Sequence, residues 1–114
     1  MASDILTYTY TAGQREGVMI VKLEGALTIS SMFSFQDDFR GMTPQILIVD
    51  LAGSPYMDSA GLGVLMNAYV SANSHGRSFL VAGANERIKA LLELTKVDGI
   101  LKNYATVAEA EASL

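Results

Sequence analysis

The sequence predicts a single α/β domain built on a mostly parallel β-sheet. Its 114 residues leave room for one hydrophobic core, since half of so short a chain could not bury enough surface for a second. Strand-like segments alternate with segments of helical spacing, an order typical of parallel sheets with right-handed crossovers. The run QILIVDL at 45–51 is almost continuously apolar, as expected of a strand that helices cover on both faces. We expect four or five strands, an N-terminal hairpin and about four helices within residues 1–114.

The N-terminal third predicts a hairpin followed by a helix. Residues 4–11 (DILTYTYT) are rich in β-branched and aromatic side chains and alternate roughly as a strand should. Residues 18–25 (VMIVKLEG) predict a second strand, and the glycines between the two make a hairpin the simplest connection. Residues 29–40 have an uneven but helix-like apolar spacing, and Thr28 is one candidate for the cap of that helix.

The remaining segments continue the alternation of strands and helices. A short loop after the strand at 45–51 leads to a helix at 59–74. The elements expected after that helix are a strand at 78–83, a helix at 84–97, a weak strand near 100–103 and a short helix to Ala112. The apolar face of helix 59–74 comprises Leu62, Leu65, Met66, Tyr69 and Val70. Outside this helix, the side chains expected to be buried are Leu47, Val49, Leu80, Leu91 and Leu92.

The composition argues against several classes of function. The net charge is −4, the pI is about 4.7 and the eight basic residues are scattered, whereas nucleic-acid binding draws on clustered Lys and Arg. Cysteine is absent, which excludes disulfides and thiolate metal sites. The sequence has no signal-peptide pattern and no apolar run of the roughly 20 residues that a membrane helix needs. We expect a cytoplasmic protein with no direct nucleic-acid partner and no membrane insertion.

Catalysis also has little support in the sequence. The only histidine, His75, falls at the end of helix 59–74 without a neighbouring catalytic partner. Ser59 lacks the G-x-S-x-G pattern of a nucleophile elbow, and the GLG that follows it lacks the Lys of a phosphate-binding loop. We expect no enzyme activity, no catalytic residue, no metal site and no cofactor.

The segment 58–63 (DSAGLG) is the most informative motif of the chain. Ser59 falls at the start of a predicted helix, so its hydroxyl could act simply as an N-cap, and Asp58 could take that role instead. Gly61 and Gly63 each cost about 0.5–1 kcal/mol relative to Ala in the first helical turns. Their lack of side chains would keep the space around Ser59 open to another protein's backbone. A regulated, partner-facing serine therefore stands beside a structural cap as the two interpretations of Ser59.

The strand at 45–51, the following loop and the motif at 58–63 together resemble the STAS family of anti-sigma factor antagonists. Members have a buried strand, a short loop and the pattern D-S-[S/T/A]-G-[LIVM]-[GA] opening an amphipathic helix. The resemblance in element order covers about residues 18–112. It implies the STAS fold, and it implies that a serine kinase, itself the anti-sigma factor, phosphorylates Ser59. The unmodified form would bind this kinase and free a sigma factor, and the phosphorylated form would not bind.

We expect the partner-binding surface to surround the phosphorylation site Ser59. One departure from the family concerns Thr28, because many antagonists have the pattern G-x-L-D after the second strand and this chain has Thr28 in place of the acidic residue. Tyr56 and Met57 would supply apolar contact area. The residues expected to contact the partner are Thr28, Ser54, Tyr56, Met57, Asp58, Gly61, Leu62 and Gly63.

A second hypothesis keeps the STAS fold but makes the chain a constitutive subunit of a larger complex. Cytoplasmic STAS subunits of lipid-transport ABC systems have a similar D-[ST]-A-G-L motif, and Ala60 fits it. Gly63, Tyr56 and Met57 favour the antagonist instead. The sequence leaves the oligomeric state open, with a weak homodimer as one option.

Overall fold

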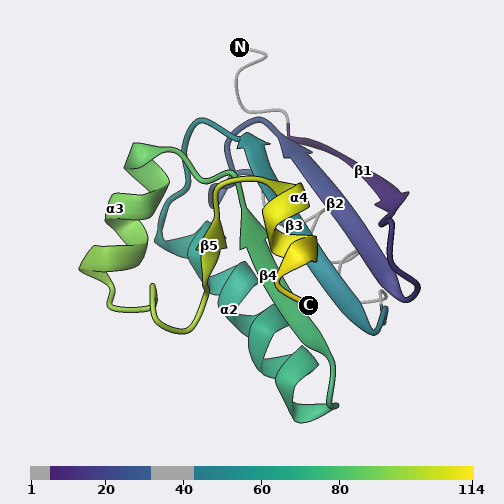
Figure 1. Ribbon diagram of the computed structural model, residues 1–114. Coiled ribbons are helices and arrows are strands. Elements are labelled where there is room, and N and C mark those ends of the chain that lie inside the picture. Colours follow the sequence, from purple (N-terminus) through teal and green to yellow (C-terminus); the bar gives the residue numbers. More distant parts are fainter. Residues whose placement is uncertain (1–5, 32–42) are drawn as a thin grey trace.

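The strands of the sheet lie side by side in the order in which they occur along the chain (Figure 1). The computed structural model describes residues 6–31 and 43–114. The strands are β1 (Thr7–Ala12), β2 (Val18–Glu24), β3 (Ile46–Gly53), β4 (Ser78–Ala82) and β5 (Asn103–Tyr104). β1 runs antiparallel to β2, and all other neighbours are parallel. The predicted mostly parallel sheet with an N-terminal hairpin is confirmed, although β5 begins where the strand expected near 100–103 should end.

Helices cover both faces of this sheet. α2 (Ser59–Ser74) and α3 (Glu86–Leu94) pack on one face, and α4 (Val107–Ala112) packs on the other (Figure 1). The helix expected at 29–40 lies largely outside the described residues, and residues 29–31 form a turn. None of the helices that the structure describes combines the length and hydropathy needed to cross a bilayer.

Alternation along β3 explains how one strand serves both layers of helices. Leu47, Val49 and Leu51 belong to the core beneath α2 and α3, whereas Ile48 belongs to the core beneath α4. Successive side chains of a strand point to opposite faces, and all four of these are buried. The apolar run in the sequence is continuous because helices cover both faces of β3, as predicted. Other core predictions that the structure confirms are Leu62, Leu65 and Leu92.

Three expected core positions are more exposed than the sequence predicted. Leu80 and Leu91 are only half-buried, and Val70 is 58% exposed. Leu80 faces the layer formed by α4, which spans only six residues and cannot cover the whole face. On α2, Tyr69 and Ala72 pack against the core instead of Val70.

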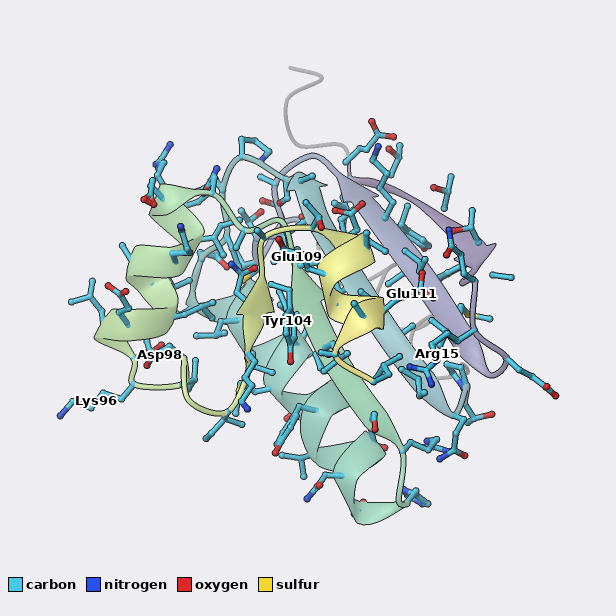
Figure 2. All side chains as sticks on the ribbon, in the orientation of Figure 1. Arg15, Lys96, Asp98, Tyr104, Glu109 and Glu111 are labelled. Carbon is cyan, nitrogen blue, oxygen red and sulfur yellow. The ribbon has the colours of Figure 1, made fainter. Side chains whose placement is uncertain are left out.

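α4 is fastened to the turn between β1 and β2. The Glu111 carboxylate accepts hydrogen bonds from the backbone N–H groups of Gln14 and Arg15 at 2.9 and 3.2 Å. The Arg15 guanidinium donates to the Leu114 carbonyl oxygen at 2.7 Å. Figure 2 shows Glu111 on α4 and Arg15 near the hairpin turn. These contacts hold the last helix against the sheet.

The loops that follow β2, β3 and β4 lie at one edge of the sheet. These strands are parallel, so their carboxyl ends meet at the same edge, where α/β proteins usually place their functional loops. The loops are 25–31, 54–58 and 83–85. The motif 58–63 begins at this edge, directly after the loop that follows β3.

Candidate functional site

Two loops at this edge are joined by backbone hydrogen bonds. The Leu27 N–H donates to the Tyr56 carbonyl oxygen at 3.0 Å, and the Asp58 N–H donates to the Leu27 carbonyl oxygen at 3.3 Å. Leu27 and Met57 thereby form a short parallel bridge outside the main strands. The loop after β2 therefore fixes the position of the segment that starts α2.

Asp58 is the N-cap of α2. One carboxylate oxygen accepts from the Gly61 N–H at 2.9 Å, which satisfies a donor that a helix start would otherwise leave unpaired. The other oxygen accepts from the Ile29 N–H at 3.1 Å. The negative charge also lies at the positive end of the helix dipole. Asp58, which is half-buried, thus links α2 to the loop 25–31 and has a structural role.

Ser59 occupies the first helical position and is not the cap. The cap interpretation of Ser59 is wrong, because Asp58 makes the capping bond from the preceding position. The Ser59 side chain is exposed, and its hydroxyl makes no hydrogen bond within residues 6–31 and 43–114. This hydroxyl is therefore accessible to another protein.

Gly61 is a glycine because the chain folds closely against it. A Cβ at this position would overlap the Leu27 carbonyl oxygen and would lie 2.9 Å from the Leu27 carbonyl carbon. The Leu27 backbone cannot easily move away, because it is hydrogen-bonded to Tyr56 and Asp58. Gly61 is itself buried. The expectation that Gly61 admits a partner's backbone is wrong, because the backbone that approaches it belongs to the protein's own loop.

Gly63 has no such internal cause within the described residues. A Cβ there would meet no described atom within 4 Å. Gly63 lies four residues after Ser59, so the two positions are neighbours on one face of the helix. A glycine here costs about 0.5–1 kcal/mol of stability relative to Ala and leaves the helix backbone accessible beside the Ser59 hydroxyl.

The loop 54–58 also contacts the start of α3. Asn85, the N-cap of α3, donates from its side-chain amide to the Pro55 carbonyl oxygen at 3.0 Å. The Arg87 guanidinium carbon lies 4.9 Å from the centre of the Tyr56 ring, which is a cation–π geometry. Tyr56 remains 40% exposed. The pair forms an aromatic, positively charged patch on the loop that leads to Ser59.

Two exposed residues of this region escaped the sequence analysis. Ile29 is 55% exposed, and its backbone is held by Asp58. In the sequence Ile29 looked like one apolar position of a helix, and Arg87 looked like one of several scattered cations. Their contacts with the loop 54–58, namely the Ile29 bond to Asp58 and the Arg87 contact with Tyr56, place both residues beside Ser59. We define the Ser59 surface as Ile29, Tyr56, Ser59, Gly63 and Arg87.

Three residues expected on this surface are buried. Ser54, Met57 and Leu62 are only 2%, 3% and 6% exposed. Met57 pairs with Leu27, and both Met57 and Leu62 pack in the core beneath α2. Ser54 closes the turn after β3, where its N–H donates to the Leu51 carbonyl oxygen at 2.9 Å. The expectation that these three side chains face a partner is therefore wrong.

Thr28 is half-buried within the loop 25–31. Its N–H donates to the Ser31 hydroxyl oxygen at 3.0 Å, and its own hydroxyl lies 3.2 Å from the Ser30 hydroxyl. The Ser31 N–H bonds to the Thr28 carbonyl oxygen, so the described part of the loop shows no capping bond to the Thr28 hydroxyl. Thr28 shapes the turn that presents Ile29.

The described residues assemble neither a catalytic pair around Ser59 nor a metal site. His75 lies at the opposite end of α2, where its Nδ1 is 2.8 Å from the Ser71 carbonyl oxygen. Within the parts of the chain that the structure describes, no three His, Asp or Glu side chains are arranged to hold a metal ion.

Comparison with known proteins identifies relatives along almost the whole chain. The STAS domain family model matches residues 9–110. An anti-sigma F factor antagonist of Paenibacillus polymyxa is 32% identical over 92 residues, which cover 77% of this chain and 79% of that protein. A Thermotoga maritima protein assigned as an anti-sigma factor antagonist is 30% identical over 99 residues, which cover 83% of this chain and 88% of that protein. A crystal structure of a Thermotoga maritima protein assigned as an anti-sigma factor antagonist matches at 28% identity with a TM-score of 0.84, over 93% of this chain and 92% of the other.

The fold is also shared with SpoIIAA of Bacillus, an anti-sigma factor antagonist solved in an unphosphorylated and a phosphorylated form. The TM-scores are 0.74 and 0.70 at 12% identity, over 91% and 94% of this chain and 92% and 98% of the other. The relatives found by sequence are named as regulatory proteins and not as enzymes, in agreement with the prediction for this chain. The chain therefore belongs to the STAS domain family, and its named sequence relatives are anti-sigma factor antagonists.

Proposed function

We propose that this protein is an anti-sigma factor antagonist whose binding to an anti-sigma factor kinase is switched by phosphorylation of Ser59. The observation that supports this most is the exposed Ser59 hydroxyl directly after the capping residue Asp58. A kinase can reach this hydroxyl without unfolding the site, because the capping bond does not involve it. Relatives named as antagonists of anti-sigma factors support the class of partner. A cytoplasmic location is part of the proposal, because sigma factors act in transcription.

The Ser59 surface has the properties of a protein-binding surface. Ile29 and Tyr56 supply exposed apolar and aromatic area, of the kind that anchors interfaces. Gly63 permits close approach, and Arg87 adds a positive charge beside Tyr56. The hydrogen bonds between the loops 25–31 and 54–58 hold these groups in place before association, which lowers the entropy cost of binding.

Phosphorylation would act on binding and not on the fold. A phosphate adds about −1.5 to −2 charges at the N-terminal end of α2, where the helix dipole stabilises an anion by about 0.3–1 kcal/mol. Repulsion from the Asp58 carboxylate opposes this gain, so the two effects on the folded state nearly cancel. At an interface the phosphate would lose its water against a surface shaped for a hydroxyl. A hundredfold loss of affinity requires only about 2.7 kcal/mol.

Reconstitution with the anti-sigma factor of the host tests the proposal. The protein is incubated with that kinase and ATP, and mass spectrometry locates the phosphate. We expect modification of Ser59 in the wild type and none in Ser59→Ala. Ser30→Ala, which removes an exposed hydroxyl on the neighbouring loop, should be modified like the wild type. Phosphate on any residue other than Ser59 would contradict the proposal.

Binding measurements separate this switch from a constitutive subunit of a transport complex. Ser59→Ala should bind the kinase like the wild type, and Ser59→Asp should bind at least tenfold more weakly, a difference of about 1.4 kcal/mol. A constitutive subunit would not bind the kinase, and its affinity for its own complex would be the same in both variants. That second result would replace the switch by the alternative.

A further inference from the structure

A hollow of about 220 Å³ lies at the opposite end of α2 from Ser59. It is open to solvent and is lined by the last turns of α2, the first residues of β4 and the segment that leads into β5. Figure 1 shows the end of α2 beside the start of β4. The residues of the lining that matter here are Tyr69, Asn73, Arg77, Phe79, Ile100 and Lys102.

The lining is basic although the protein is acidic. Among the described residues, the lining includes the two cations Arg77 and Lys102 and no acidic residue, whereas the whole chain has 12 acidic and 8 basic residues. The ion pair found in the described residues joins Lys89 to Glu86. Arg77 and Lys102 therefore have no acidic partner within these residues. Arg77 is half-buried, and a charge beside low-dielectric protein attracts an anion more strongly than a fully solvated charge does.

The rest of the lining combines an apolar wall with neutral hydrogen-bonding groups. Phe79 and Ile100 supply apolar surface, and the Tyr69 hydroxyl and the Asn73 amide can donate hydrogen bonds. Ligand sites in proteins typically have apolar walls with a few polar groups that fix orientation. At about 30 Å³ per water molecule, the hollow has space for a ligand of about seven to ten non-hydrogen atoms.

We propose that this hollow binds a small organic anion, with a carboxylate or phosphate group on a short apolar body. Arg77 binds the anionic group through its planar guanidinium, and Lys102 adds a second positive charge. Phe79 and Ile100 cover the apolar body. Tyr69 follows Ser59 by ten residues on the same helix, which is about 15 Å along the axis. The site is therefore separate from the Ser59 surface and does not depend on the proposed function.

Titration of the isolated protein, followed by ¹H–¹⁵N NMR, tests the proposal. The probes are benzoate, butyl phosphate and the neutral benzyl alcohol. We expect saturable shifts of the Asn73, Arg77 and Lys102 amides with at least one anion, and no saturable shift with benzyl alcohol. The anion that binds more tightly identifies the preferred head group. Shifts that do not saturate with either anion would overturn the proposal.

Charge-matched variants show whether the lining cations cause the binding. Arg77→Gln and Lys102→Gln should each weaken anion binding at least fivefold. Lys22→Gln removes an exposed positive charge on β2, away from the hollow, and should bind within twofold of the wild type. Should Arg77→Gln lose its folded spectrum, the exposed Lys102 decides alone. Equal binding by Lys102→Gln and Lys22→Gln would refute the site.

Discussion

Replacing Gly61 with alanine should destabilise the protein, although alanine is the better helix former. Intrinsic propensity alone would stabilise α2 by about 0.5–1 kcal/mol. The added methyl group would overlap the Leu27 carbonyl oxygen and would lie 2.9 Å from the carbonyl carbon. Backbone atoms cannot rotate out of the way as the end of a flexible side chain can. The loop that contains Leu27 would have to move.

The magnitude follows from the hydrogen bonds that this movement strains. Leu27 bonds to Tyr56 and Asp58 at 3.0 and 3.3 Å, and Ile29 bonds to the Asp58 carboxylate at 3.1 Å. Each such bond contributes about 0.5–1.5 kcal/mol, and overpacking in general costs about 1–3 kcal/mol. After subtraction of the propensity gain, we expect Gly61→Ala to lower the free energy of unfolding by about 2 kcal/mol.

Urea unfolding followed by circular dichroism measures this effect, with Gly63→Ala as the matched control. Gly63→Ala should raise the free energy of unfolding by about 0.5–1 kcal/mol, since no described atom lies within 4 Å of its added Cβ. The m-value should not change in either variant, so the midpoints should move in opposite directions. A Gly61→Ala protein as stable as the wild type would refute the explanation of this glycine by the Leu27 backbone.

The same unfolding assay checks three further predictions. Asp58→Ala should lower the free energy of unfolding by about 2 kcal/mol, because it removes both the cap of α2 and the bond to the loop 25–31. Ser59→Ala should stay within about 0.5 kcal/mol of the wild type, and equal losses in the two variants would contradict the assignment of the cap. Leu65→Ala, which removes a buried core side chain, should lower the free energy of unfolding by about 2–5 kcal/mol. Leu94→Ala, at a position 81% exposed, should stay within about 0.5 kcal/mol of the wild type, and similar losses in the two variants would mean that the core is misplaced. Thr106→Ala removes the cap of α4 and should lower the free energy of unfolding by about 0.5–2 kcal/mol. An unchanged urea midpoint would show that α4 does not need this cap.

The sheet could be predicted because its signals are local. The continuous apolar run that became β3 required cover on both faces, and α2 and α4 provide it. The alternation of strands and helices then predicted that the strands run mostly parallel, whereas their order in the sheet comes from the structure. The same topology places the motif 58–63 at the carboxyl edge of the sheet.

The partner-facing residues could be predicted only in part, because burial in loops depends on contacts between distant segments. Met57 is buried because it pairs with Leu27 of another loop. The segment 54–58 has no apolar periodicity from which this burial could be predicted. Gly61 has the same distant cause. Leu62 had two predicted roles, and the helical spacing that placed it in the core was the better guide.

The capping residue of α2 shows a different limit of sequence reasoning. Asp58 and Ser59 are both residue types that favour the N-cap, so composition cannot decide between neighbours. The extended backbone of Asp58 and its bond to the Gly61 N–H settle the question in the structure. A serine released from the capping role is then free to serve as a modification site.

The affinity of the anti-sigma factor kinase for this protein with phosphoserine at position 59 is the most direct test of the proposed switch. The phosphorylated and unmodified proteins are titrated into the kinase by isothermal calorimetry, and their unfolding in urea is compared in parallel. We predict an affinity at least a hundredfold lower for the phosphorylated form, or about 2.7 kcal/mol. We predict that the free energy of unfolding changes by no more than about 1 kcal/mol. Equal affinities, or a loss of affinity that only accompanies unfolding, would contradict a switch that acts at the Ser59 surface.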